Sequence, residues 1–171
     1  MDEVSKRARA IRLAIFDVDG VMTDGTLFIG AEGEDFKAFN ILDGHGVKML
    51  QSAGVAAAII SGRSSEAVTR RAAELSIAHV VQGSPDKSAA FDALIASLAL
   101  SEDQCAFVGD DLPDLPVMRR CGLAVAVANA ADPVKSAAHY VTRASGGHGA
   151  VREFCELVLD AQGQLAAHSA P

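Results

Sequence analysis

Short apolar runs alternate along this chain with segments of helical periodicity. The runs are rich in Val, Ile, Leu and Ala, and such continuous runs are typical of strands buried on both faces of a parallel sheet. We therefore predict an α/β fold with a doubly wound, mostly parallel sheet covered by helices. The predicted strands are Ile11–Phe16, Val55–Ile60, His79–Val81, Cys105–Val108, Leu123–Val127 and Tyr140–Val141.

Helical spacing and turn residues predict several further elements. Phe91–Leu98 and Val151–Val158 carry apolar residues at positions i, i+3, i+4 and i+7, which predicts two core-facing helices. Thr26–Ile29 and Phe36–Phe39 flank a polar turn, so residues 25–40 are expected to form a small β-hairpin after the first strand.

Composition indicates a folded domain. The chain has 171 residues, of which 50% are hydrophobic, so we exclude disorder and predict a single domain over residues 1–171. Residues 162–171 are rich in Ala, Gln and Ser and are expected to be a flexible tail.

The apolar runs are much shorter than the roughly 20 residues of a membrane-spanning helix. The charged residues 1–12 lack the apolar core of a signal peptide, so we expect a cytoplasmic protein that does not bind membranes.

Charge and cysteine content narrow the possible partners. With 22 acidic and 15 basic residues the net charge is −7, which argues against nucleic acid as a partner. A site for an anion must therefore create its own local positive charge. The cysteines, Cys105, Cys121 and Cys155, are odd in number and lack metal-ligand spacing, so we expect buried, reduced thiols.

Polar residues come directly or shortly after several predicted strands, and ligands of doubly wound sheets bind beyond the carboxyl ends of the strands. These residues are Asp17 and Asp19, Ser61, Lys87, and Asp110 and Asp111. Each has an ordinary alternative. The first pair could be a turn before Gly20, Ser61 a strand-to-helix turn, and Lys87 a solvated surface residue.

Lys87 is unusual for its expected position. Ser84 and Pro85 are predicted as the N-cap and first residue of a helix, which places Lys87 in its first turn. A cation there opposes the helix dipole, so its presence indicates nearby anions.

Asp110, Asp111 and Asp114 form a crowded acidic cluster. Crowded carboxylates repel one another unless a cation compensates them, and a divalent ion such as Mg²⁺ takes oxygen ligands. The alternative is a solvated, acidic helix start.

Together these motifs resemble those of the haloacid dehalogenase-like phosphatases. The matching stretches are DVDGVMTDG at 17–25, ISGR at 60–63, Lys87, and GDDLPD at 109–114. KAFNILDGHG at 37–46 and GGHGAVRE at 146–153 are similar to the capless subfamily that acts on 3-deoxy-D-manno-octulosonate 8-phosphate. The similarity extends from about residue 11 to 162 and implies a Rossmann-like fold.

The resemblance implies phosphoryl transfer through an aspartyl-phosphate. Asp17 would be the nucleophile, and Asp19 would protonate the leaving hydroxyl and then activate water. Ser61 and Lys87 would hold the phosphoryl oxygens. Mg²⁺ would be bound by Asp17, the backbone carbonyl of Asp19, and Asp110. Asp111 or Asp114 would orient metal-bound water or Lys87, and the sequence leaves that choice open.

The resemblance also implies a set of substrate contacts for a small sugar-acid phosphate. Arg63 is well suited to the sugar-acid carboxylate, because arginine can bind it with two hydrogen bonds. Arg71 and Lys48 could instead be exposed helix positions. His148 stands where the family often has Arg. Whether this glycine-rich segment helps to bind the anion in a neighbouring subunit's site is therefore left open. The full set is Asp19, Asn40, Asp43, Gly44, Lys48, Arg63, Arg71 and Lys87.

The spacing of the motifs leaves no room for a cap domain. Asp17 and Ser61 are 44 positions apart, and Ser61 and Lys87 are 26 apart. The resemblance to the capless subfamily implies that the sites are covered by assembly into a homotetramer, and we expect the same assembly here.

Three alternative functions are considered. A signalling receiver domain would carry its phosphoacceptor on the third strand, whereas the Asp pair here follows the first. A non-catalytic domain of the same fold would be expected to lack Asp19 or Lys87. A phosphatase of a nine-carbon, sialic-acid-type 9-phosphate is the nearest enzymatic alternative.

Overall fold

A six-stranded, all-parallel sheet forms the centre of the molecule, in the strand order β5-β4-β1-β6-β7-β8. The computed structural model describes residues 2–31 and 33–168. The predicted α/β sheet is confirmed, with boundaries that differ from the expected ones by no more than two residues. The strands are β1 Leu13–Phe16, β4 Ala56–Ile60, β5 His79–Val81, β6 Cys105–Gly109, β7 Leu123–Ala126 and β8 Tyr140–Val141.

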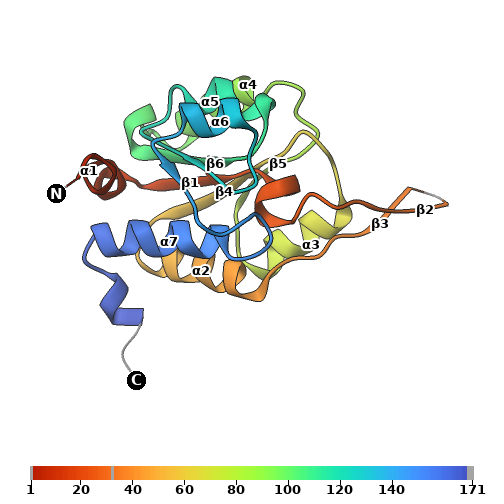
Figure 1. Ribbon diagram of the computed structural model, residues 1–171, viewed down its shortest axis with the longest axis horizontal. Helices are drawn as coiled ribbons and strands as arrows, with labels where there is room; N and C mark the ends of the chain where they lie inside the picture. The colour runs from red at the N-terminus through yellow and green to blue at the C-terminus, as the bar shows by residue number, and fades with distance from the viewer. Residues whose placement is uncertain (1, 32, 169–171) are drawn as a thin grey trace.

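Helices cover both faces of this sheet (Figure 1). One face carries α2, α3 and α7, and the other carries α4, α5 and α6, while α1 lies near the amino-terminal end of β1. The two helices predicted from apolar spacing correspond to α4 and α7. The bounds are α1 Glu3–Ala10, α2 Ile41–Ser52, α3 Glu66–Glu74, α4 Lys87–Ser97, α5 Leu115–Met118, α6 Asp132–Ala137 and α7 Ala150–Ala161.

The core is packed around the two central strands. All residues of β1 and β6 are buried, and the ring of Phe154 on α7 meets that of Phe16 edge to face at 5.7 Å. Each fully buried side chain of this size contributes roughly 1.5–3 kcal/mol. The three cysteines are free and buried, as expected, and burial raises the pKa of Cys105 to about 11 and that of Cys121 to about 12.

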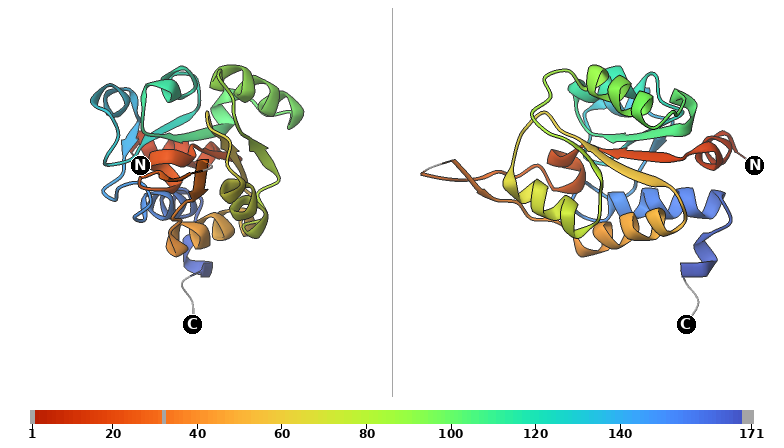
Figure 2. Two further views of the ribbon diagram at one scale, coloured as in Figure 1. Left: turned by 90° about the vertical axis from the view of Figure 1, so that its right-hand side faces the viewer. Right: turned by 180° about the vertical axis from the view of Figure 1, so that it is seen from behind.

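A β-hairpin of β2 (Phe28–Gly30) and β3 (Gly33–Phe36) projects from the body of the molecule (Figures 1 and 2). The hairpin was predicted, but its arms lie nearer to the turn than expected. The second strand ends at Phe36, and the next residue, Lys37, is buried. The rings of Phe28 and Phe36 stack at 4.6 Å across the two strands.

The described chain between the motifs forms only small elements. From Asp17 to Ser61 it comprises a short helical segment, the hairpin, α2 and β4, and from Ser61 to Lys87 it comprises α3 and β5. The described residues therefore contain no cap domain. None of the described helices is long and apolar enough to cross a membrane.

Residues 162–168 of the expected flexible tail are described by the structure. The Gln162 side chain donates to the carbonyls of Ala8 and Ile11, and Leu165–His168 form a short 3₁₀ helix. The last three residues, 169–171, lie outside the described part of the chain.

Candidate active site

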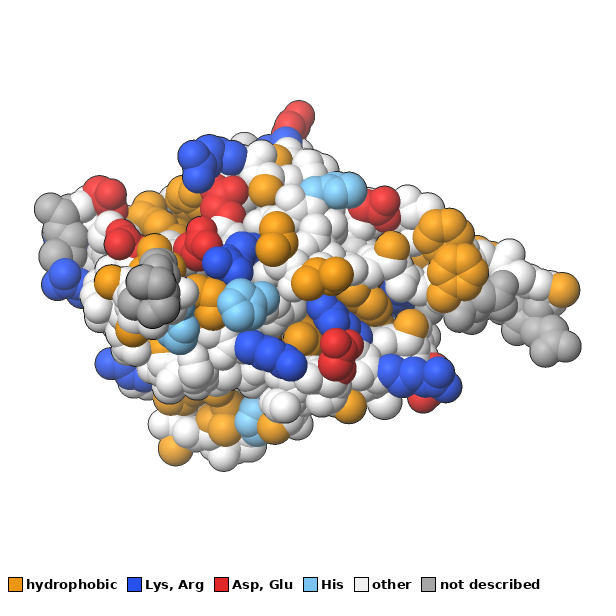
Figure 3. Space-filling view, turned by 90° about the horizontal axis from the view of Figure 1, so that it is seen from below, with side chains coloured by type: hydrophobic (Ala, Val, Ile, Leu, Met, Phe, Trp, Pro, Cys, Tyr) orange, Lys and Arg blue, Asp and Glu red, His pale blue; other side chains and the backbone are white. Residues whose placement is uncertain are grey.

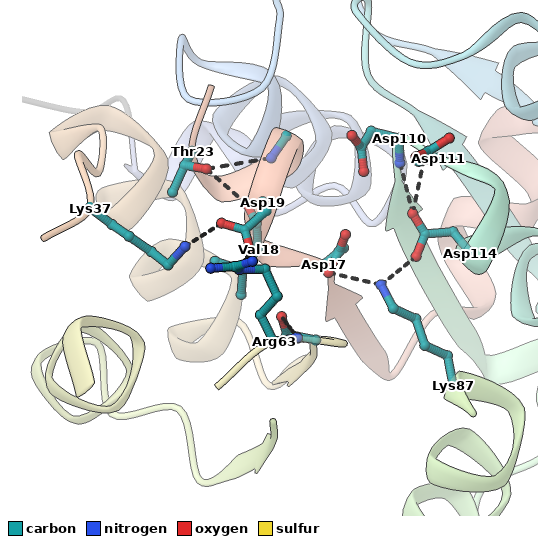
Figure 4. A network of polar contacts seen from close by, with 12 residues as sticks. Asp17, Val18, Asp19, Thr23, Lys37, Arg63, Lys87, Asp110, Asp111 and Asp114 are labelled. Carbon is teal, nitrogen blue, oxygen red and sulfur yellow. Dashed lines mark hydrogen bonds and ion pairs between the residues drawn. The ribbon is translucent and has the colours of Figure 1, made fainter. Parts of the chain in front are cut away.

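The polar residues that follow β1, β4 and β6 meet at one edge of the sheet. β1 lies between β4 and β6, where the strand order changes direction, and parallel α/β sheets bind ligands at such points. A cavity of about 250 Å³ opens there (Figure 4). Its lining residues are Asp17, Asp19, Ser61, Gly62, Arg63, Lys87, Asp110, Asp111, Pro113 and Asp114.

Lys87 bridges two carboxylates at the base of this cavity. Its ammonium lies 2.8 Å from an oxygen of Asp17 and 2.7 Å from one of Asp114, and all three residues are at most 7% exposed. Burial alone would lower the pKa of Lys87, but the two carboxylates together raise it. The lysine is therefore held as a cation where an anion could approach it.

The position of Lys87 in the first turn of α4 is confirmed, but the predicted N-cap is wrong. Asp86, not Ser84, caps the helix, and its carboxylate accepts hydrogen bonds from the amides of Ser88 and Ala89. A carboxylate binds these positively polarised amides with a full negative charge, which the Ser84 hydroxyl lacks.

Asp114 organises the acidic cluster from inside. One of its carboxylate oxygens binds Lys87, and the other accepts the amides of Asp110 and Asp111 at 2.9 and 3.2 Å. Asp111 is exposed, and its carboxylate accepts the amide of Leu112. Of the two alternatives that the sequence left open, the structure thus brings Asp114 to Lys87.

Asp110 is the uncompensated carboxylate of the cavity. Among the described residues, none donates a hydrogen bond to its carboxylate, and burial together with the charges of Asp17, Asp114 and Asp111 raises its pKa to about 8. Burial and the Asp114 charge likewise raise the pKa of Asp17 to about 6. The ammonium of Lys87 therefore does not offset all the carboxylates that meet in this cavity.

The donor set fits a hard divalent cation. Oxygens of Asp17, Asp110 and Asp114 lie within 4.8 Å of one another, and carboxylate oxygens suit Mg²⁺. Because both oxygens of Asp114 are already bonded, Asp17 and Asp110 are the carboxylates that remain to hold an ion. Gly20 leaves the required room, since a Cβ there would lie 2.0 Å from an oxygen of Asp110.

Asp19 lies at the rim of the cavity between two cations. One carboxylate oxygen accepts a hydrogen bond from the Lys37 ammonium, and the other lies 3.6 Å from Nε of Arg63. The Lys37 side chain is 1% exposed, whereas that of Arg63 is 49% exposed. Lys37 was not predicted as a site residue, because a lysine beside a hairpin is ordinarily solvated.

Ser61 is buried directly after β4, as its position predicted. Its amide donates to the carbonyl of Val81, its carbonyl accepts the amide of Ser84, and its hydroxyl accepts the amide of Arg63 at 3.4 Å. These contacts fix the loop so that Ser61 and Arg63 line the same cavity.

Several residues that the resemblance assigned to the substrate do not line this cavity. Asn40 caps α2 through the amides of Leu42 and Asp43. The Asp43 carboxylate accepts the amides of Gly149 and Arg152 at the start of α7, at 3.3 and 2.8 Å. Burial raises the pKa of Asp43 despite these bonds.

Arg71 and Lys48 also lie outside the cavity that contains Asp17, Asp110 and Asp114. Arg71 donates to the carbonyl of Asn40 and pairs with Glu74, and it packs so close to Gly44 that a Cβ there would lie 2.2 Å from its guanidinium. Lys48 is exposed on α2. Asn40, Asp43 and Gly44 thus lie at the start of α2, where Asp43 and Gly44 are buried, and Lys48 lies further along the same helix.

Thr23 and Asn129, which the sequence analysis missed, hold the loop that follows Asp17. The Thr23 hydroxyl accepts the amides of Gly20 and Gly25, and the Asn129 side chain joins the Gly20 carbonyl to the Gly146 amide. The Thr23 bonds are local, within residues 18–25, whereas those of Asn129 join segments that are far apart in the sequence.

A larger cavity, of about 450 Å³, lies at the opposite end of the sheet near Arg9 and Arg12. Its polar side chains are half-buried or exposed. We therefore place the candidate active site in the smaller cavity, where the buried charges converge.

Comparison with known proteins finds relatives that match nearly the whole chain. Residues 72–154 match the family model of the haloacid dehalogenase-like hydrolases. The chain is 49% identical over 164 residues to the 3-deoxy-D-manno-octulosonate 8-phosphate phosphatase KdsC of Yersinia pestis, covering 96% of this chain and 88% of that relative.

Solved structures superpose closely on the whole chain. A probable yrbi family phosphatase from Pseudomonas syringae has a TM-score of 0.95 at 57% identity, covering 98% of this chain and 96% of that one. The 3-deoxy-D-manno-octulosonate 8-phosphate phosphatase of Moraxella catarrhalis, solved in complex with a magnesium ion, a phosphate ion and KDO, has a TM-score of 0.96 at 43% identity. That match covers 99% of this chain and 97% of the other.

Proposed function

The chain belongs to the haloacid dehalogenase-like hydrolases and, within them, to the 3-deoxy-D-manno-octulosonate 8-phosphate phosphatase family; from this premise we propose that it hydrolyses this sugar-acid phosphate. The products are 3-deoxy-D-manno-octulosonate and inorganic phosphate. The observation that carries the proposal is the buried Asp17–Lys87–Asp114 array beside the uncompensated Asp110. This array offers a nucleophile, a fixed cation and a metal site in one cavity.

In the proposed mechanism Asp17 attacks phosphorus. The bond between phosphorus and the sugar oxygen breaks, and an aspartyl-phosphate forms on Asp17. Asp19 gives a proton to the departing sugar oxygen, then takes a proton from the water that attacks phosphorus in the second step. In that step the bond between phosphorus and Asp17 breaks and phosphate leaves, so the net reaction consumes one water and returns Asp17 to its carboxylate and Asp19 to its protonated form.

Lys87 and Ser61 act on the phosphoryl group during both steps. The Lys87 ammonium and the Ser61 hydroxyl are assigned to the phosphoryl oxygens, whose charge distribution changes during transfer. Asp114 positions Lys87 and the amides of Asp110 and Asp111. Fixed partners of this kind keep the lysine oriented before the substrate arrives.

Asp17 and Asp110, together with the backbone carbonyl of Asp19, are the proposed ligands of Mg²⁺. The bound ion offsets the repulsion between the Asp17 carboxylate and the dianionic phosphate. Without it, the carboxylates of the cavity would oppose the approach of the substrate.

Arg63 is the proposed partner of the sugar-acid carboxylate. It lines the catalytic cavity, is half exposed and can bind a carboxylate with two hydrogen bonds. Five residues on α2, on its N-cap and on α3 are also proposed to contact substrate as in the family: Asn40, Asp43, Gly44, Lys48 and Arg71. Because these residues do not line the cavity of their own chain, they would contact substrate only if assembly brings them to the site of a neighbouring chain.

We propose that the chain acts as a homotetramer in the cytoplasm, where its free cysteines stay reduced. The projecting hairpin carries exposed apolar side chains, with Phe28 at 40%, Ile29 at 68% and Phe36 at 57% exposure (Figure 3). Exposed apolar patches mark interaction surfaces, and a neighbouring hairpin would supply the cover that a cap domain supplies elsewhere.

Light scattering coupled to size-exclusion chromatography tests this assembly. We expect a particle about four times the 17.7 kDa chain, and we expect Ile29→Lys to dissociate it and lower turnover. Val141→Lys, at a residue that is 39% exposed but lies on β8, is the matched control. A fully active monomer would rule out the proposed assembly.

Phosphate release from a substrate panel tests the activity itself. The eight-carbon 8-phosphate is compared with a sialic-acid-type 9-phosphate and a simple hexose phosphate, each with Mg²⁺ and with a chelator. We expect the highest kcat/KM for the eight-carbon compound and no turnover with the chelator. Preference for the nine-carbon compound would reassign the substrate, and phosphate release from none of them would refute the phosphatase function.

A further inference from the structure

Lys37 is a buried charge to which the proposed chemistry gives no task. It follows β3 directly, at the base of the hairpin, and its side chain is 1% exposed. Its ammonium donates a hydrogen bond to Oδ1 of Asp19. Burying an ammonium costs free energy unless an anion pairs with it, so this contact is built into the fold.

Lys37 and Arg63 approach Asp19 differently. Arg63 comes from the loop after β4, lines the catalytic cavity and is half exposed, so it is able to turn toward a substrate. Lys37 reaches Asp19 from the side away from Asp17 (Figure 4). Its buried stem leaves the ammonium little freedom to follow a ligand.

The backbone around Asp19 is held in place, but the orientation of the Asp19 carboxylate depends on a cationic partner. Asp19 and Gly20 interrupt the short helical segment at 18–22, with Gly20 at φ +92°. Thr23 and Asn129 hold this backbone through the amide and carbonyl of Gly20. These backbone contacts fix the position of the Asp19 main chain. The contacts of its carboxylate that orient the side chain are those with Lys37 and Arg63.

We propose that Lys37 is a positioning residue that aims the Asp19 carboxylate at the leaving oxygen of the substrate. This inference rests on the proposed acid/base role of Asp19. It also links the hairpin to the chemistry, because the exposed Phe36 directly precedes Lys37. Displacement of the hairpin base would move the acid/base group, and a misplacement of about 1 Å can lower a rate by about 10²-fold.

Lys37→Met tests the role with little change in volume. Replacing one member of a partly buried pair by an apolar group of similar size removes the charge without opening a cavity. We expect kcat to fall about 10- to 100-fold while KM changes less than about 3-fold. Lys37→Arg is expected to recover part of kcat, and Lys6→Met, on the exposed face of α1, to behave as wild type.

A double-mutant cycle with Asp19→Asn separates positioning from a general structural effect. If Lys37 acts through Asp19, adding Lys37→Met to Asp19→Asn lowers kcat no further. Thermal unfolding of each variant verifies that it is folded, and Lys37→Gln replaces Lys37→Met in the cycle if the latter does not fold.

The outcomes distinguish this inference from the function on which it rests. If Asp19→Asn is impaired but Lys37→Met lowers kcat by the same factor in both backgrounds, Lys37 does not act through Asp19 and the inference is overturned. An unchanged kcat in Lys37→Met also overturns it. Full turnover by Asp19→Asn would instead remove the acid/base role itself.

Discussion

At the scale of single residues, two neighbouring carboxylates of the acidic cluster have different partners. Asp114 is 1% exposed and binds Lys87 and two backbone amides, whereas Asp111 is exposed and caps Leu112. We expect Asp114→Asn to lower kcat by about 10- to 100-fold, since Lys87 loses one of its two anionic partners. Asp111→Asn serves as the comparison and is expected to cost less than about 3-fold. Equal losses in steady-state assays would contradict this division of roles.

The sequence predicted those functional residues whose position along the chain is itself the signal. Asp17, Ser61 and Lys87 come directly or shortly after buried strands, and the parallel sheet brings them together. Lys37 and Asn129 gave no such signal, because their contacts with Asp19 and Gly20 join segments that only the tertiary fold brings together.

At the scale of elements, Asp43 joins α2 to the start of α7. Its carboxylate accepts the amides of Gly149 and Arg152, which are otherwise unpaired donors at a helix start. We expect Asp43→Ala to lower the free energy of unfolding by about 1–2 kcal/mol, as for the loss of a helix cap. Asp160→Ala, at an exposed position of α7, is the control. Denaturant unfolding that gives the two variants equal stability would show that this link contributes nothing.

The elements also show where sequence patterns lose precision. The strands of the sheet were predicted closely, since four of them, β1, β4, β6 and β7, are apolar runs that are almost wholly buried. The arms of the hairpin were misplaced, because Phe28, Ile29 and Phe36 are exposed and do not follow the pattern of a buried strand, while Phe28 stacks on Phe36 and Lys37 is buried. Neither contact produces a periodic pattern.

At the scale of the whole molecule, the buried carboxylates couple stability to pH and to Mg²⁺. Without metal, the pKa values of Asp17 and Asp110 are raised to about 6 and about 8, above the roughly 4 of an unfolded aspartate. A raised carboxyl pKa gives stability that is present at acid pH and lost as the pH rises through the folded value. We therefore expect the metal-free protein to lose thermal stability between pH 5.5 and pH 8.5.

Mg²⁺ should reverse this loss, because it binds the ionised carboxylates and displaces their protons. The increase in Tm on adding Mg²⁺ is expected to be larger at pH 8.5 than at pH 5.5, and Asp110→Asn should abolish most of it. Differential scanning calorimetry at the two pH values measures this difference. An increase that is equal at both, or larger at pH 5.5, would contradict the assignment of the metal site.

The central claim is that Asp17 carries the phosphoryl group during turnover. The most direct measurement is mass spectrometry of acid-quenched protein during hydrolysis of the eight-carbon 8-phosphate, with peptide mapping of the phosphorylated residue. We predict one phosphoryl group on Asp17, absent in Asp17→Asn, whose turnover falls by at least about 10³-fold. A phosphoryl group on another residue, or undiminished turnover by Asp17→Asn, would contradict the account.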